Sequence, residues 1–238
     1  MADPIVTDAP ITPSTAIPPR PDTPHLIHAN GHDTSNFIKH TSGNRLQRAL
    51  IRRFHRTIVA QVTALAPETF LDAGCGEGFV ARVLRRHLPA LDLTGCDLNP
   101  AAARLAAAQN TGAHFAAASL LALPFADDAF DVVGCFEVLE HLPGDAPALA
   151  LRELARVARR AVVLSVPHEP VFSLANVARA KNLDVRPPGS DPDHRQFWTR
   201  QAFGDLVATS LDVAWLGGSL PWTVCVATPK PSHPNQPA

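Results

Sequence analysis

The sequence predicts a single α/β domain built on a doubly wound, mostly parallel sheet. Short apolar runs of strand length alternate with stretches in which apolar residues recur every three or four positions, as in strand-helix-strand units. In one such unit, residues 70–97, the first strand joins its helix through three alternate glycines. The chain has 238 residues, of which 46% are hydrophobic, so it is long enough to bury one core.

The elements follow in order from apolar periodicity and from capping signals. Asn99 and Pro100, for example, suit the N-cap and the first position of an alanine-rich helix. The expected strands are residues 70–72, 91–97, 114–118, 130–136, 161–166, 211–216 and 222–227. The expected helices are residues 44–66, 79–87, 146–159 and 199–210, and the one that begins at Pro100.

Residues 70–78, FLDAGCGEG, are the stretch around which the other elements are arranged. A buried strand ends at Asp72 and turns through Gly74, Gly76 and Gly78 into a helix. Glycine permits a positive φ angle and a close backbone approach, and a helix start leaves N–H groups that can face a ligand. The pattern predicts a ligand-binding turn, although glycine turns also join strands to helices without binding anything.

A second acid indicates what this turn binds. Asp97 ends the next strand, nineteen positions after Gly78, where a βαβ unit places a carboxylate that accepts hydrogen bonds from ribose hydroxyls. The dinucleotide fingerprint has glycines at relative positions one, three and six. Counted from Gly74, the third glycine is at position five and Phe79 is at position six, which disfavours NAD.

The run LDAGCGEG at residues 71–78 resembles the first motif of the class I S-adenosylmethionine-dependent methyltransferases, and Asp97 matches that family's acid after the second strand. The resemblance extends over about residues 68–167 and is closest to the small-molecule, type 11 and ubiquinone-pathway enzymes. It implies a Rossmann-like sheet of order 3-2-1-4-5-7-6 with an antiparallel last strand. It also implies S-adenosylmethionine as the cofactor and a small organic methyl acceptor, with O- or C-methylation favoured.

The resemblance further implies which residues hold the cofactor. Asp72 would steady the turn and the amino-acid end of the cofactor. Ser119 stands where the family usually has an acid that reads adenine, so backbone groups near Leu120 would read adenine instead, or affinity would be lower. The expected cofactor-binding residues are Asp72, Ala73, Gly74, Cys75, Gly76, Gly78, Asp97, Leu98, Ser119, Leu120 and Glu137.

Polar residues after the fourth expected strand mark the rim where open α/β sheets bind ligands. We expect His141 to be the base that deprotonates an acceptor, with an equal alternative in which it only fixes the turn. His168 and His194 are weaker candidates for the same role. The expected acceptor-binding residues are Glu140, His168, His194 and Trp198.

Glu137, Glu140 and His141 have i, i+3, i+4 spacing, so on a helix they would share a face and could bind a divalent cation. The spacing resembles the Glu-x-x-Glu-His of ubiquinone-pathway O-methyltransferases. Ordinary polar rim residues are the more common explanation, and we expect no metal. The Asn/Asp-Pro-Pro-aromatic motif of the family's nucleic-acid and amide N-methyltransferases is absent from this position, so base methylation is disfavoured.

The expected methyltransferase domain spans residues 35–228. Residues 1–34 and 229–238 are rich in proline, and we expect them to be disordered. Residues 168–198 are poorly patterned and are expected to form a lid or substrate insertion. Residues 35–67 are expected to contain a cap helix with one apolar face.

The cap helix is basic, because several arginines occur in the stretch between Asp33 and Glu68 and no acid does. Its Arg48, Arg52 and Arg56 could contact an anionic surface, although a solvated helix back is the more common explanation. The whole chain has a net charge of −1, so we expect no nucleic-acid partner.

Four single cysteines in or beside apolar runs predict reduced core thiols in a cytoplasmic protein. The sequence has no apolar run near the roughly 18 residues that span a bilayer, so we expect no integral membrane segment. Two alternative functions stay open. One is a non-catalytic S-adenosylmethionine-binding regulatory module, and the other is N-methylation of a small amine or an anionic lipid headgroup.

Overall fold

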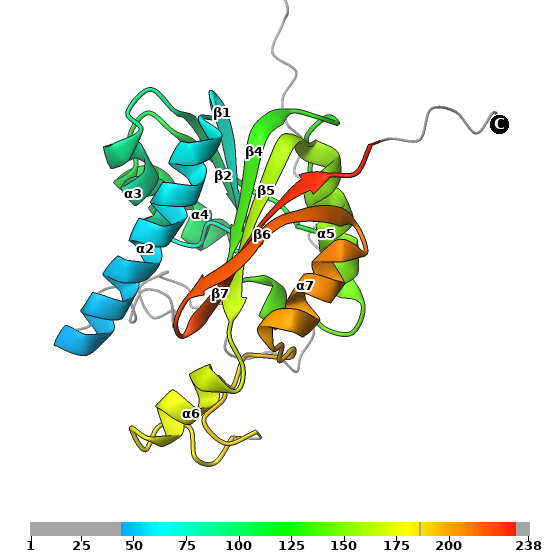
Figure 1. Cartoon of the computed structure of the whole chain (residues 1–238). Helices are drawn as coiled ribbons and strands as arrows, with labels where there is room; N and C mark the ends of the chain where they lie inside the picture. The colour runs from blue at the N-terminus through cyan, green and yellow to red at the C-terminus, as the bar shows by residue number, and fades with distance from the viewer. Residues whose placement is uncertain (1–43, 186, 232–238) are drawn as a thin grey trace, which may run out of the picture.

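The computed structural model describes residues 44–185 and 187–231 (Figure 1). The strands are β1 (Thr69–Ala73), β2 (Asp92–Asp97), β3 (His114–Ala117), β4 (Phe130–Phe136), β5 (Ala158–Pro167), β6 (Leu211–Ser219) and β7 (Trp222–Pro229). The helices are α2 (Arg45–Leu65), α3 (Phe79–His87), α4 (Pro100–Gln109), α5 (Ala146–Val157), α6 (Val171–Val177) and α7 (Arg200–Ala208), with a 3-10 helix η1 at Leu139–His141. The expected disordered leader lies outside the described residues, as does most of the expected tail.

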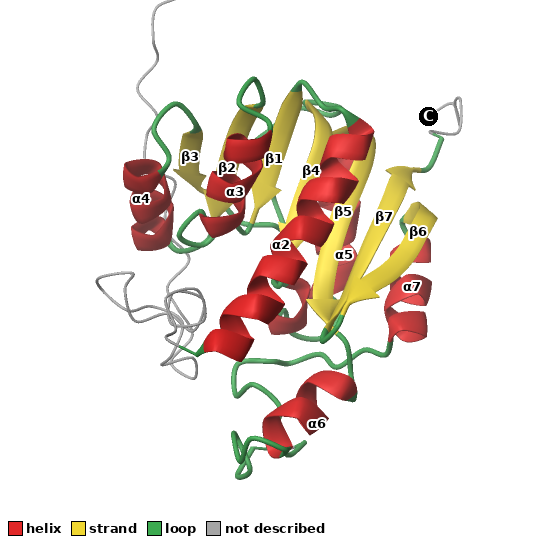
Figure 2. Cartoon of the chain, turned by 60° about the vertical axis from the view of Figure 1, so that its left-hand side comes forward, coloured by secondary structure: helices red, strands yellow, loops and turns green. Residues whose placement is uncertain are grey.

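The strands form one sheet in the order β3-β2-β1-β4-β5-β7-β6. Strands β1 to β5 are parallel, and β7 lies antiparallel to both β5 and β6. This arrangement confirms the predicted order and the predicted antiparallel last strand. Helices α2 and α3 cover one face of the sheet, and α5 and α7 cover the other (Figures 1 and 2).

Two apolar layers hold the helices on the sheet. Ile58 of α2 and Leu84 of α3 are fully buried in one layer, while Leu151 of α5 and Phe203 of α7 are fully buried in the other. Fully burying side chains of this size contributes roughly 1.5–3 kcal/mol each. All four cysteines are reduced and buried, as the sequence predicted.

Helix α2 is capped by Asn44 and has the predicted apolar face, of which the later turns are buried. The side chain of Asn44 accepts hydrogen bonds from the first turn, and Phe54, Ile58 and Val62 are buried. Leu46, at the start of the apolar pattern, is 59% exposed, because the first turns of α2 project beyond the sheet (Figure 1).

The segment after β5, which was expected to form a lid or insertion and is called the lid below, crosses the end of the sheet. It contains α6, which lies beyond the arrowhead of β5 (Figure 1), followed by turns and an extended return to α7. The domain boundaries that we assigned around this segment stay a prediction. None of the helices within the described residues is both long and apolar enough to cross a membrane.

Candidate functional site

The glycine turn packs against the ends of two strands. The Gly74 and Cys75 N–H groups both donate to the Cys96 carbonyl, at 2.7 and 2.9 Å. The Gly76 N–H donates to Asp97 Oδ2 at 2.8 Å, and the Gly78 N–H donates to the Cys75 carbonyl at 2.9 Å. The N–H groups of Gly74, Cys75 and Gly76 thus bind the turn to the end of β2, and that of Gly78 closes the turn on itself. The role of the glycines in cofactor binding stays a prediction.

The glycines instead permit the path of the turn. Gly74 has a φ of 78°, and a Cβ there would lie 2.5 Å from a methyl carbon of Val138. Gly78 has a φ of 75° as the N-cap of α3, and a Cβ there would lie 2.5 Å from the Asn110 amide nitrogen. A side chain at either position would be strained and would clash, so glycine lets Val138 and α4 approach the turn.

Two carboxylates converge beside this turn. Asp72 in β1 is 1% exposed, and its Oδ2 accepts no hydrogen bond from the described residues. Burial, together with the nearby Asp97 charge, raises the pKa of Asp72 from 3.8 to about 7. Burial also raises the pKa of Asp97, although the Asn99 and Gly76 N–H groups act against that rise.

This pair selects the charge of a ligand. The Asp97 charge raises the pKa of the buried Asp72, and the Glu77 charge adds to the rise at Asp97. Such a concentration of negative charge favours a cationic group and repels a pyrophosphate. The Asp97 oxygens accept from Gly76 N and Asn99 N, each at 2.8 Å, and each oxygen has a second lone pair that a ribose hydroxyl could use. A ligand with a cationic end and a ribose therefore fits better than a dinucleotide.

The segment expected to read adenine is a tight turn. Ser119 Oγ accepts from the Leu121 N–H at 3.2 Å, so the serine holds the turn while its own hydroxyl hydrogen can be donated. Leu120 packs against the core, and Leu98, next to Asp97, is 77% exposed. Because the Leu98 side chain is apolar, exposed and next to the polar site, it is suited to cover a flat ring of a ligand.

Arg156 of α5 fixes this segment and was missed from the sequence. Its guanidinium donates to the Leu123 and Phe125 carbonyls at 3.0 and 2.8 Å and to both Glu153 oxygens. Glu153 in turn accepts from the Leu123 N–H at 2.8 Å. These charge-assisted bonds hold the loop against α5. The only signal in the sequence was the spacing of Glu153 and Arg156, which lie three residues apart on one expected helix and could therefore form an ion pair.

Glu137, at the end of β4, adopts a conformation that non-glycine residues rarely take, with a φ of 57°. Its N–H donates to the Ser165 carbonyl at 3.1 Å, and its Oε1 accepts from Ser165 Oγ at 2.9 Å. Backbone strain of this kind occurs where the surroundings fix it and often marks a functional site. The side chain therefore points to β5, and the role of Glu137 in cofactor binding stays a prediction.

The structure brings Glu140, His141 and His194 together at the rim, although His194 is distant in sequence. Glu140 and His194 are 1% and 8% exposed, and His141 Nε2 lies 4.0 Å from Glu140 Oε1. His141 Nδ1 lies 3.1 Å from the Asp193 carbonyl, which can only accept, so Nδ1 carries the hydrogen. On a neutral His141, Nε2 is therefore the unprotonated ring nitrogen.

Two other expected acceptor-binding residues lie away from this group. His168 Nδ1 lies 3.2 Å from Thr223 Oγ1 of β7, and burial lowers the pKa of His168. Trp198 packs on Phe203 of α7, with ring centroids 5.7 Å apart, and adjoins the core. These contacts explain both residues as supports for the lid and for α7, and their roles in acceptor binding stay predictions.

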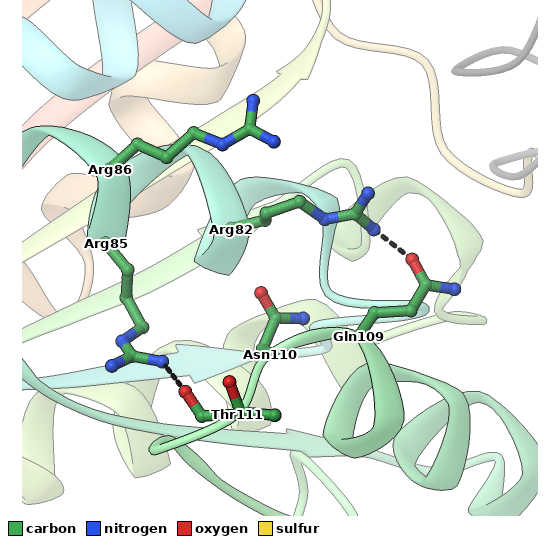
Figure 3. Close-up of a pocket in the computed structure, with 6 residues that line it drawn as sticks. All are labelled: Arg82, Arg85, Arg86, Gln109, Asn110 and Thr111. Carbon is green, nitrogen blue, oxygen red and sulfur yellow. Dashed lines mark hydrogen bonds between the residues drawn. The ribbon is translucent and has the colours of Figure 1, made fainter.

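A shallow groove between α3 and α4 lies apart from this site (Figure 3). It is lined by Arg82, Arg85, Arg86, Gln109, Asn110 and Thr111. Arg82 donates to the Gln109 side chain and Arg85 to the Thr111 carbonyl, as Figure 3 shows. Cations at the carboxyl end of a helix stabilise it, so these arginines have a structural explanation.

Comparison with known proteins agrees with this geometry. The family model described as a methyltransferase domain matches residues 71–166, which include the glycine turn, both aspartates and the rim. The matched domain is a class I S-adenosylmethionine-dependent methyltransferase. S-adenosylmethionine is the cofactor of that family, and it combines the cationic end and the ribose that the site favours.

Curated relatives resemble the methyltransferase domain over part of their length. The malonyl-[acyl-carrier protein] O-methyltransferase of Herminiimonas arsenicoxydans is 37% identical over 111 residues, which are 45% of this chain and 41% of that protein. The demethylmenaquinone methyltransferase of Thermus thermophilus is 34% identical over 142 residues, 57% of this chain and 64% of that protein. The chain thus spans about two fifths to two thirds of these relatives.

A solved structure shows the same fold. The magnesium protoporphyrin IX methyltransferase of Synechocystis, determined with bound SAH, superposes with a TM-score of 0.59 at 20% identity. The alignment covers 84% of this chain and 96% of that protein. At this identity the likeness establishes the fold and not the acceptor.

Proposed function

We propose that the protein transfers a methyl group from S-adenosylmethionine to an oxygen of a small organic acceptor. The observation that carries the proposal is the pair of carboxylates beside the glycine turn, the buried Asp72 and the half-buried Asp97, which favours a cationic adenosyl ligand. Asp97 would hold the ribose, Leu98 would cover the adenine, and Asp72 would face the cationic amino-acid end. The O-methyltransferase among the relatives supports oxygen as the acceptor atom.

Methyl transfer needs alignment and exclusion of water more than chemical activation. S-adenosylmethionine would supply a methyl group already activated by its sulfonium, and transfer of that group to the acceptor oxygen would leave S-adenosylhomocysteine and a proton for the protein to accept. His141 would take the hydroxyl proton on Nε2, and the contact of its Nδ1 with the Asp193 carbonyl at 3.1 Å supports this role because it would keep the hydrogen on Nδ1. The lid that carries Asp193 would exclude water.

A methyl-transfer screen tests this proposal. The full chain is incubated with S-adenosylmethionine carrying a labelled methyl group and with panels of phenols, quinones, carboxylates and amines. We expect label in a hydroxylated acceptor and stoichiometric S-adenosylhomocysteine. The Asp97→Ala variant serves as the control and should lose both signals. Cofactor binding without transfer to any panel would contradict the enzymatic proposal and favour a binding module, whereas label only in amines would contradict oxygen as the acceptor atom.

We also propose that the exposed arginines of α2 contact an anionic surface. Arg48, Arg52 and Arg56 recur at helical spacing and are exposed, and α2 contains no acid. Reversing these three charges should abolish co-sedimentation with vesicles of anionic lipid in low salt. Reversing Arg104, exposed on α4, is the matched control and should leave it unchanged. A parent protein that never co-sediments would refute the contact.

A further inference from the structure

We propose that Glu140, His141 and His194 form a site for one divalent transition-metal ion that joins the lid to the rim of the sheet. One ligand atom from each of these side chains lies within 4.8 Å of the other two. Two imidazoles and one carboxylate are a common ligand set for divalent iron, cobalt and zinc, and three protein ligands leave positions open. The inference concerns metal binding, and only its consequence for the acceptor rests on the proposed function.

The site is built from two parts of the chain that the backbone fixes to each other. Glu140 and His141 lie in η1, directly after β4, and His194 comes from the lid. The N–H groups of Arg195 and Gln196 donate to the Glu140 carbonyl at 2.8 and 3.0 Å. The ligands therefore sit on a rigid junction, and each is largely or partly shielded from water.

A second observation orients His141 for a metal. Metal-binding histidines usually donate the hydrogen of their other ring nitrogen to a carbonyl or carboxylate, which fixes the ring and its tautomer. His141 Nδ1 has this partner in the Asp193 carbonyl at 3.1 Å. The Asp193 carbonyl comes from the residue before His194, so the lid supplies one ligand and orients another.

The ligand set differs from the one that sequence spacing suggests. Glu137 would share a face with Glu140 and His141 only if the whole segment were helical, but the 3-10 helix spans only residues 139–141. The positive φ of Glu137 precedes this turn, and its Oε1 accepts from Ser165 Oγ at 2.9 Å. Among the described residues, the group with converging ligand atoms includes His194 and not Glu137.

Metal binding would change the role of this group in methyl transfer. The open coordination positions could take one or two acceptor oxygens, and the charge of the ion would lower the pKa of a bound hydroxyl. In the loaded protein His141 is then a ligand, and the ion replaces it as the group that favours proton loss. The site would favour acceptors with two neighbouring oxygens, such as a vicinal diol, a catechol or a hydroxy acid.

Titration with Co²⁺ tests the inference without relying on methyl transfer. The full chain is freed of metal with a chelator and titrated with cobalt chloride, and the visible absorption of the bound ion reports its ligands. We expect saturation at one equivalent and at least a tenfold loss of affinity in His194→Ala. His168→Ala, which alters a neighbouring lid histidine outside the group, and Glu137→Gln should bind Co²⁺ like the parent.

Circular dichroism and thermal unfolding check that the variants fold. Absence of saturable Co²⁺ binding in the folded parent would overturn the proposal. The proposal would also be overturned if folded His194→Ala bound Co²⁺ as tightly as the parent. It would likewise be overturned if Glu137→Gln lost as much Co²⁺ affinity as is expected for His194→Ala. Should His194→Ala fail to fold, the conservative His194→Gln replaces it with the same expected loss. A protein that binds Co²⁺ but methylates nothing would refute only the proposed function.

Discussion

Replacing Asp72 with asparagine should change how the stability of the protein depends on pH. The folded protein raises the pKa of Asp72 from 3.8 to about 7, chiefly because the carboxyl is buried. A raised pKa means that folding favours the protonated acid. The penalty for holding the charged form therefore appears as pH rises through the interval from about 4 to about 7 and is complete above it.

The size of the effect follows from that shift. About three pKa units at roughly 1.4 kcal/mol each give a penalty of about 4 kcal/mol, as an upper limit, in the parent protein above pH 7. Asp72→Asn has no such titration. The free energy of unfolding of the variant, minus that of the parent, should therefore rise by up to about 4 kcal/mol between pH 4.5 and pH 8.

Urea unfolding of both proteins, followed by circular dichroism at half-unit steps of pH, measures this difference. Using the difference removes the contributions of groups that titrate in both proteins, Asp97 among them to a first approximation. Parallel stability curves would refute the reasoning, because they would mean that Asp72 is already ionised in the folded protein. S-adenosylmethionine should stabilise the parent more at pH 8 than at pH 5.5, since its cationic groups favour the ionised acid.

Other predictions test the supports of the site. Ile58→Ala, in the buried face of α2, should lower the free energy of unfolding by about 2–5 kcal/mol. Leu46→Ala, at an exposed position of the same helix, should change it by less than about 0.5 kcal/mol. Equal effects of the two substitutions in urea titrations would contradict the packing of α2. Arg156→Met should release the 119–125 loop and so weaken S-adenosylmethionine binding, which calorimetry measures. Arg152→Met, at an exposed position of α5, should leave this affinity unchanged. Gly74→Ala should be less stable than the parent, because its methyl group would meet Val138, and full stability in thermal unfolding would contradict that clash.

The strand order and the elements at the glycine turn could be predicted because their signals are local. Asn99 and Pro100 start α4 as expected, and the Asn99 side chain accepts from the Ala101 N–H at 2.9 Å. Strand β5 was expected from residue 161 but begins at Ala158. Arg159, expected in the helix, instead donates to Asp131 at 2.8 Å, and Ala158 pairs with Phe130. A contact between distant residues overrode helix propensity there.

The parts of the site that were not predicted depend on the folded path of the chain. Nothing in the sequence places His194 beside His141, because the lid that joins them lacks regular periodicity. The Glu137 side chain turns to Ser165 because of a backbone conformation that its sequence does not signal. The use of the glycine N–H groups within the turn was likewise not evident, because glycine patterns indicate backbone freedom and not hydrogen-bond partners.

The most direct test of the central claim is the affinity for S-adenosylmethionine, measured by isothermal titration calorimetry on the parent protein and on folded Asp97→Ala. We predict one binding site in the parent, at least tenfold weaker binding in the variant, and no heat with NAD. Equal affinity in the two proteins, or binding of NAD in place of S-adenosylmethionine, would contradict the claim that the paired carboxylates and the glycine turn form the cofactor site.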